Sequence, residues 1–273
     1  MVIKLDFARH DPAHCLAPGL FRALRKGERK TEKLDVTYEY GDGERLEFSG
    51  PEPLGADDLR VLQGLVAMAG PDGILLHPEP ADENARQLWL NLDPKFDGLK
   101  HSSLVVKSSF GMLARETGMT CSGKSYSLIR ESIERLFKVS VFVQNGKRRA
   151  GFHLLSFVAS DDASGHLFVA LNPRIAQAIL GERQYARIEM SEVRAIKSDP
   201  ARLIHQRLSA WVNPNSSRVV ALTTLAGYAW TGTASASTTR KRLERTRKAL
   251  LELEACGWGF THYADGNVLV KRP

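Results

Sequence analysis

The order of its secondary structure elements constrains the fold of this 273-residue chain most strongly, because one order occurs twice. It consists of a short helix, a tight turn, a longer amphipathic helix and a β-hairpin, as indicated by apolar spacing and turn residues. The two copies occupy residues 108–118, 124–138 and 139–157, and then residues 221–229, 238–256 and 258–270. This is the order of a winged helix-turn-helix. The sequence therefore predicts an α+β protein with two tandem winged-helix domains.

The elements around the two copies predict the domain boundaries. We expect a basic N-terminal arm over residues 1–34, a first winged-helix domain over residues 35–190 and a second over residues 191–273. The other expected elements are a hairpin over 36–48 that turns at 41–43, helices over 56–69, 175–180 and 200–211, and a strand over 167–171. Gly70-Pro71 is expected to end the helix over 56–69.

Positive charge is concentrated in the helix over 238–256. The net charge of +7 and the pI of about 9.4 favour a polyanionic partner. Between Arg240 and Lys248 there are six Lys and Arg residues and one Glu. Leu243, Thr246, Leu250 and Leu253 share one stripe of this helix, and Lys241, Arg245 and Lys248 lie on the opposite side. Such a helix can enter the roughly 12 Å wide major groove of DNA. The predicted contacts are Ser237, Thr238, Thr239, Arg240, Lys241, Arg242, Arg245 and Lys248, with Lys271 and Arg272 after the last hairpin.

The first predicted domain has fewer features of a base-reading module. Glu131 and Glu134 lie near the polar face of the helix over 124–138, where they would repel phosphates. We therefore expect this domain to contact the DNA backbone and the second domain to discriminate sequence. The predicted contacts are Lys124, Ser127 and Lys138 on the helix, and Lys147, Arg148 and Arg149 at the tip of the following hairpin.

Residues 118–125 match the phosphate-binding pattern G-x-x-x-x-G-K-[ST]. A phosphate-binding loop needs a buried β-strand directly before it, whereas residues 110–117 have the pattern of a helix. The strand over 167–171 ends in Asn172 and not in a magnesium-binding Asp. A P-loop ATPase is therefore the alternative of a different class, and we predict that no nucleotide is bound.

A second cluster with ligand-like side chains consists of His10, Asp11, His14 and Cys15. Pro12 indicates an irregular segment, so we predict no metal site. The chain has neither the H-x-H pair of nicking relaxases nor a G-x-S-x-G elbow. These observations predict a protein that is not an enzyme and has no cofactor.

The cellular compartment of the protein is predicted from its cysteines and from the hydropathy of the chain. The three cysteines are an odd number and form no C-x-x-C pair, which indicates reduced thiols. Apolar runs are shorter than the ~20 residues that a membrane helix needs, and residues 1–11 have no signal-peptide core. We predict a cytoplasmic protein without a membrane partner.

Three segments resemble the RepC family of iteron-binding replication initiators of IncQ-type plasmids. They are residues 10–22 (HDPAHCLAPGLFR), 34–55 (LDVTYEYGDGERLEFSGPEPLG) and 169–173 (VALNP). The resemblance implies binding to direct repeats, the iterons, in double-stranded origin DNA, and opening of an adjacent A·T-rich segment. It also implies entry of a plasmid helicase and primase, and neighbouring copies of the chain on adjacent repeats. A transcriptional repressor or autoregulator with the same fold remains the alternative within this class.

Overall fold

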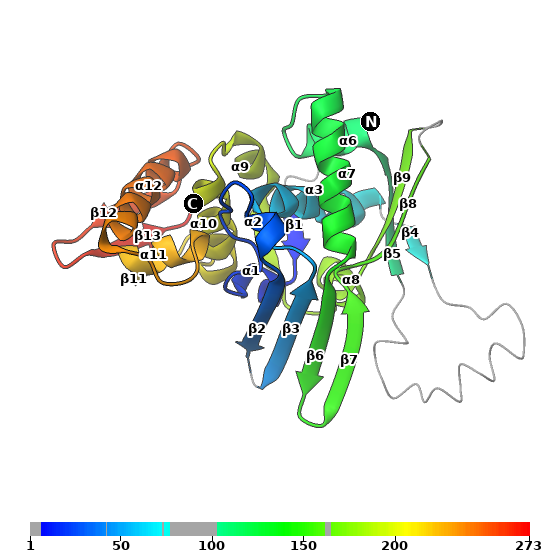
Figure 1. The fold of residues 1–273 in the computed structure, drawn as a ribbon, viewed down its shortest axis with the longest axis horizontal. Coiled ribbons are helices and arrows are strands. Elements are labelled where there is room, and N and C mark those ends of the chain that lie inside the picture. The colour runs from blue at the N-terminus through cyan, green and yellow to red at the C-terminus, as the bar shows by residue number, and fades with distance from the viewer. Residues whose placement is uncertain (1–6, 42, 73, 77–102, 162–164) are drawn as a thin grey trace, which may run out of the picture.

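The computed structural model describes residues 7–41, 43–72, 74–76, 103–161 and 165–273, which form a mixed α/β fold (Figure 1). The first elements are β1 (Phe7–His10), α1 (Pro12–Leu16), α2 (Glu28–Thr31), β2 (Leu34–Tyr40), β3 (Glu44–Gly50), α3 (Ala56–Asp72) and β4 (Ile74–Leu76). Position 42 in the predicted turn lies outside the described residues. Helix α3 continues two residues past Gly70, a difference of the size usual for helix ends.

One succession of elements and one sheet order occur twice. In the first unit, helix α3 is followed by β5 (Ser103–Ser109), α6 (Phe110–Glu116), α7 (Gly123–Phe137), β8 (Leu155–Asp161) and β9 (His166–Leu171). The second unit consists of α10 (Asp199–Trp211), β11 (Ser217–Ala221), α11 (Leu222–Ala229), α12 (Ala236–Glu254), β12 (Gly259–His262) and β13 (Asn267–Lys271). The first sheet has the order β4-β5-β9-β8 and the second the order β11-β13-β12, so three strands are arranged alike in both sheets, and all these pairs are antiparallel. The predicted order of a short helix followed by a longer helix is therefore present in both units.

The hairpin after α7 differs from the prediction. Strands β6 (Ser140–Asn145) and β7 (Arg148–His153) turn at Asn145-Gly146 as expected, but β6 pairs with β3 in a separate sheet of order β2-β3-β6-β7. The return strand ends at His153, and Phe157 belongs to β8. Leu154 and Leu155 are both buried, which breaks the alternation of the strand, and the Leu154 amide donates to the Val139 carbonyl. The hairpin that pairs with β5 is consequently β8–β9.

The N-terminal residues are folded into the first unit. Strand β1 pairs with β10 (Ala186–Glu189), and Ala8 and Ala13 are buried. The expectation of an irregular segment around Pro12 was wrong, because proline is tolerated in a first helical turn and Asp11 caps α1 by accepting from the His14 amide. The domain boundary at residue 34 stays a prediction.

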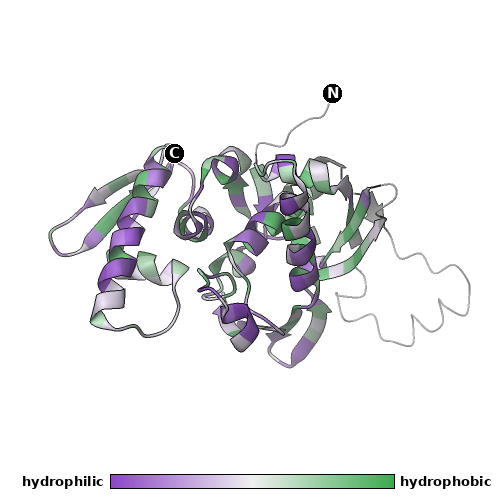
Figure 2. Cartoon of the chain, turned by 45° about the horizontal axis from the view of Figure 1, so that its top comes forward, coloured by the Kyte–Doolittle hydropathy of each residue, from purple (hydrophilic) through white to green (hydrophobic). Residues whose placement is uncertain are grey.

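Two hydrophobic cores meet at α10, to which α8 (Pro173–Leu180) and α9 (Met190–Ala195) lead. Leu203 of α10 packs into the first core, whereas Ile204 and Leu208 pack into the second. Hydrophilic residues predominate along α12 (Figure 2). No helix within the described ranges is both long and apolar enough to cross a bilayer.

Candidate nucleic-acid interface

Helix α12 begins with a hydroxyl-rich cap. The Ser235 hydroxyl accepts from the Thr238 amide at 3.3 Å and lies 3.1 Å from the Ser237 hydroxyl. Ser237 and Thr239 are exposed and Thr238 is half-buried, and the first turn contains no acidic residue. The positive end of the helix dipole is therefore not offset by a carboxylate of its own first turn, and hydroxyl donors surround it.

The two faces of α12 are separated as the spacing predicted. Thr246, Leu250 and Leu253 are buried, and α12 packs on α10 and α11. On the other side, Lys241, Arg245 and Lys248 are exposed. The buried side fixes the helix on its unit, so the basic side faces solvent along the N-terminal half.

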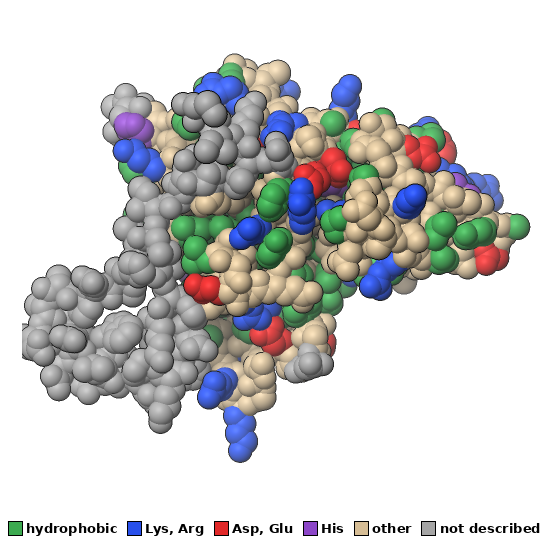
Figure 3. Space-filling view, turned by 180° about the vertical axis from the view of Figure 1, so that it is seen from behind, with side chains coloured by type: hydrophobic (Ala, Val, Ile, Leu, Met, Phe, Trp, Pro, Cys, Tyr) green, Lys and Arg blue, Asp and Glu red, His purple; other side chains and the backbone are tan. Residues whose placement is uncertain are grey.

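Within the described ranges, most Lys and Arg side chains of α12 form no ion pair and no hydrogen bond. The exceptions are Lys248, which forms an ion pair with Glu244 at 2.8 Å, and Arg242, which donates to the Gly232 carbonyl at 3.1 Å. Lys248 lowers the pKa of Glu244, with a smaller contribution from Arg245. Arg240 and Lys241 form no ion pair with any carboxylate among the described residues. On the reverse face of the molecule, by contrast, several Lys and Arg side chains lie beside Asp or Glu (Figure 3).

The two basic residues at the end of the chain have different environments. Lys271 is exposed, but it lies opposite Gly259 at the base of the β12–β13 hairpin, which follows the C-terminal end of α12. Arg272 is 3% exposed, and its guanidinium donates to three backbone carbonyls, those of Ser209, Val212 and Arg187. The prediction of Arg272 as a DNA contact was therefore wrong, because its donors are occupied inside the fold.

The predicted contacts of the first unit are exposed but do not converge. Lys124 and Ser127 lie in the first turns of α7 and Lys138 follows its last residue, about 20 Å away at 1.5 Å per residue. The hairpin tip with Lys147 and Arg148 lies a further ~20 Å along β6. These residues therefore mark a line along α7 and β6, visible in Figure 1, and not a single patch.

One residue of the hairpin tip is partly neutralised. The Arg149 guanidinium forms an ion pair with Glu47 at 2.7 Å and lies 4.7 Å from the centre of the Phe142 ring. Glu131 and Glu134 are exposed on α7. This unit therefore offers scattered cations next to carboxylates, in contrast to α12.

The segment with the phosphate-binding pattern connects two helices. Helix α6, and not a buried strand, precedes Gly118, and Lys124 is an exposed residue in the first turn of α7. The helix predicted before Gly118 is confirmed. This geometry lacks the strand-to-loop connection that a phosphate-binding loop requires.

The ligand-like cluster near the N-terminus is buried. His14 Nδ1 lies 2.9 Å from Asp11 Oδ1, and Arg174 Nε lies 3.0 Å from Asp11 Oδ2. Burial and the neighbouring His14 lower the pKa of His10 to about 4. Within the described ranges, no group of three or more His, Cys, Asp or Glu side chains is placed to hold a metal ion.

The structure places a further basic residue, Arg25, beside α12, and this contact was not predicted from the sequence. Arg25, Lys241 and Arg245 line one hollow of about 290 Å³. Arg25 is more than 200 positions away from α12, so no local periodicity connects them. Arg247 of α12 is also exposed and was counted among the six cations but not predicted as a contact.

Comparisons with known proteins give one family and several similar folds. The family model of replication protein C (RepC) matches residues 2–273. No curated protein sequence matches the chain. The fold is similar to that of domains 2 and 3 of RctB, with a TM-score of 0.58 and 11% sequence identity over 96% of this chain and 98% of that chain. A crystal structure of the Pi initiator protein in complex with iteron DNA gives a TM-score of 0.54 and 12% identity over 100% of this chain and 99% of that chain.

Proposed function

The chain belongs to the replication protein C (RepC) family, and from this premise we propose that it is a DNA-binding plasmid replication initiator. It binds direct repeats in double-stranded origin DNA sequence-specifically, without a cofactor and without catalysing a reaction. The observation that carries the proposal is the exposed basic face of α12, whose Arg240 and Lys241 have no carboxylate partner among the described residues. The similar Pi initiator protein was crystallised with iteron DNA, which supports the same class of ligand.

We interpret the two units as winged-helix modules. The repeated succession of elements and the matching sheet orders support this interpretation. In the second module, α12 is the helix that enters the major groove, with Lys241 and Arg245 directed to base edges and the hydroxyls of Ser237 and Thr239 to phosphates. In the first module, α7 and the β6–β7 hairpin contact the backbone along the same face of the duplex.

Opening of the origin is the mechanical part of the proposal. Several copies bind neighbouring repeats, and the array bends or untwists the DNA at a cost of roughly a few kcal/mol per site. The stored deformation favours melting of an adjacent A·T-rich segment, into which the plasmid helicase and primase are loaded in the cytoplasm. Permanganate footprinting on supercoiled origin DNA tests this step. Unreactive thymines in the bound origin would indicate a repressor that leaves the duplex closed.

The DNA-binding step is tested with a duplex carrying one origin repeat and a scrambled duplex, at about 150 mM salt. We expect the repeat to bind at least about 10³-fold more tightly than the scrambled duplex. Lys241→Ala/Arg245→Ala should abolish most of this ratio, because a lost base contact costs about 1–3 kcal/mol of discrimination.

A charge-matched control for this test is Lys107→Ala/Lys197→Ala, which removes two exposed lysines outside α12. It should retain the wild-type ratio. Equal binding of the two duplexes by the wild-type protein would refute sequence-specific recognition.

A further inference from the structure

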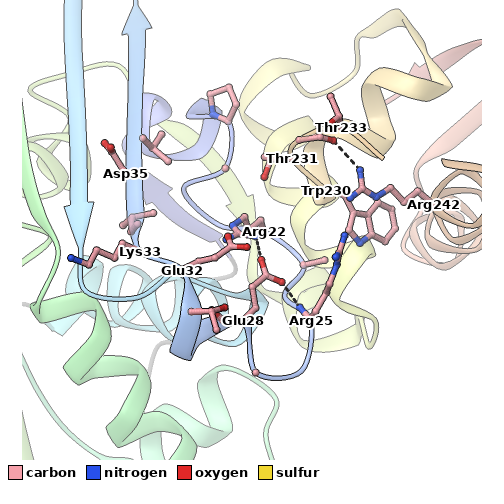
Figure 4. A pocket seen from close by; sticks show the side chains of 18 of the residues that line it. Arg22, Arg25, Glu28, Glu32, Lys33, Asp35, Trp230, Thr231, Thr233 and Arg242 are labelled. Carbon is pink, nitrogen blue, oxygen red and sulfur yellow. Dashed lines mark hydrogen bonds and ion pairs between the residues drawn. The ribbon is translucent and has the colours of Figure 1, made fainter. Parts of the chain in front are cut away.

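A groove runs beside the N-terminal half of α12, between residues 22–37 and residues 230–245 (Figure 4). It consists of adjoining hollows of about 940 Å³ and 290 Å³, and Arg25, Trp230 and Arg242 line both. We propose that this groove holds the sugar-phosphate backbone of the DNA strand that borders the major groove entered by α12. Arg25 and Lys26 bind its phosphates. The inference rests on the proposed DNA-binding function and adds a contact from outside the second module.

The wall that carries Arg25 is held in place by both units. The Ala23 amide donates to the Ala229 carbonyl at 2.8 Å, directly before the turn that leads to α12. On the other side, the Arg22 amide donates to the Leu54 carbonyl at 3.1 Å, and Arg29 forms an ion pair with Asp58 at 2.9 Å. Arg25 is therefore positioned next to α12 by the fold and is not carried on a free arm.

Of the three carboxylates of this wall that line the larger hollow, Glu28 and Glu32 are paired, whereas Asp35 is exposed and forms no ion pair among the described residues. Arg22 forms ion pairs with Glu28 and, at 2.6 Å, with Glu32. Glu28 also accepts from the Arg25 backbone amide at 2.7 Å, which orders the loop without using the Arg25 side chain. Arg25 and Lys26 are exposed and form no ion pair within the part of the chain that the structure describes. The wall thus presents two exposed cations next to Glu28, a carboxylate that Arg22 already occupies.

The opposite wall is also positive. In the smaller hollow, Arg25 faces a surface formed by Lys241, Arg242 and Arg245, and Asp199 is the one carboxylate among the described lining residues. Cations gathered around one hollow repel each other unless an anion lies between them. A guanidinium can bind a phosphate through two parallel hydrogen bonds, and the hydroxyl of Thr238 adds a donor beside it. This set of groups fits the phosphodiester backbone of the duplex that α12 reads.

The test uses the full-length protein and measures affinity for the repeat and scrambled duplexes across a range of salt concentrations. Arg25→Gln/Lys26→Gln should weaken binding to both duplexes by a similar factor and leave their ratio unchanged. The slope of log affinity against log salt should become shallower by about 1.8, since each phosphate contact contributes about 0.9. Arg25→Lys/Lys26→Arg, which keeps both charges, should retain most of the wild-type slope.

The matched control is Lys107→Gln/Lys197→Gln, which also removes two exposed positive charges. This control should keep the wild-type slope of log affinity against log salt. If the slope becomes shallower by the same amount in both double variants, the effect is one of net charge, and the inference is overturned. A wild-type slope in Arg25→Gln/Lys26→Gln would overturn it as well. The proposed function fails separately, when the wild-type protein itself does not prefer the repeat.

Discussion

Replacement of Arg272 by alanine should destabilise the second unit while leaving the exposed basic face of α12 intact. Arg272 Nη1 donates to the carbonyls of Ser209 at 2.5 Å and Val212 at 2.9 Å, and Nη2 donates to that of Arg187 at 2.5 Å. The guanidinium also lies 5.6 Å from the centre of the Trp258 ring. Arg272 therefore joins the last strand to the end of α10 and to β10 of the first unit.

The size of the expected loss in stability follows from the backbone carbonyls that the truncation leaves without a donor. A hydrogen bond from a charged group contributes about 1.5–3 kcal/mol, and a buried acceptor that loses its donor costs about 1–3 kcal/mol. These values are not additive within one network, so the loss of three donors to neutral carbonyls costs less than the sum of three such bonds. We therefore expect Arg272→Ala to lower the free energy of unfolding by about 4 kcal/mol.

Urea denaturation followed by tryptophan fluorescence measures this change, because Trp258 reports on the environment of Arg272. With an m-value of about 2 kcal/mol/M, the midpoint should fall by about 2 M. The adjacent exposed residue provides the control: Lys271→Ala should change the free energy of unfolding by less than about 0.5 kcal/mol. An Arg272→Ala protein with the wild-type midpoint and weakened DNA binding would refute the assignment of Arg272 to the fold.

Two further predictions concern the first unit. Asp58 is fully buried and binds Arg135 at 2.8 Å and Arg29 at 2.9 Å, so Asp58→Ala should lower the free energy of unfolding by about 3–5 kcal/mol in urea denaturation; a loss below about 1 kcal/mol would contradict the reasoning. The pKa of His10 is lowered from 6.5 to about 4, so below pH 6.5 the unfolded chain takes up the proton first and stability falls as the pH falls towards 4. Unfolding at pH 7 and pH 4.5 should show that wild type loses about 2 kcal/mol more than His10→Asn, and identical pH profiles would exclude His10 as the cause.

The helices were predictable from the sequence, because it contains the residues that cap them and the apolar spacing that defines their buried faces. Ser109 accepts from the Met112 amide at 3.2 Å and Ser122 from the Ser125 amide at 3.3 Å, so both helices of the first pair begin with a capping serine. The separation of α12 into a buried and a basic face follows directly from a period of 3.6 residues. Such features depend on neighbours three or four positions apart, which a sequence displays.

The pairing of strands that are far apart in the sequence, and the burial of individual side chains, were not predictable in this way. The partner of β6 is β3, about 100 positions earlier, and the two hairpins that meet there each have a complete local pattern of their own. Lys271 and Arg272 are adjacent cations with opposite environments, because strand alternation places consecutive side chains on different faces. A sequence shows that alternation, but which face meets α10 is decided by the packing of the whole unit.

The position of α10 links the surfaces of the two units that we propose contact DNA. Leu203 packs into the first core and the next residue, Ile204, into the second, so this helix is a shared structural element and not a flexible linker. Rotation of one unit against the other would expose apolar surface of α10 to water, at about 25 cal/mol for each Å². The distance between Arg25, which contacts of both units position, and Lys241 on α12 is therefore fixed by the fold. A duplex seated on α12 consequently meets the Arg25 wall without a further conformational change, and its affinity should depend on both surfaces at once.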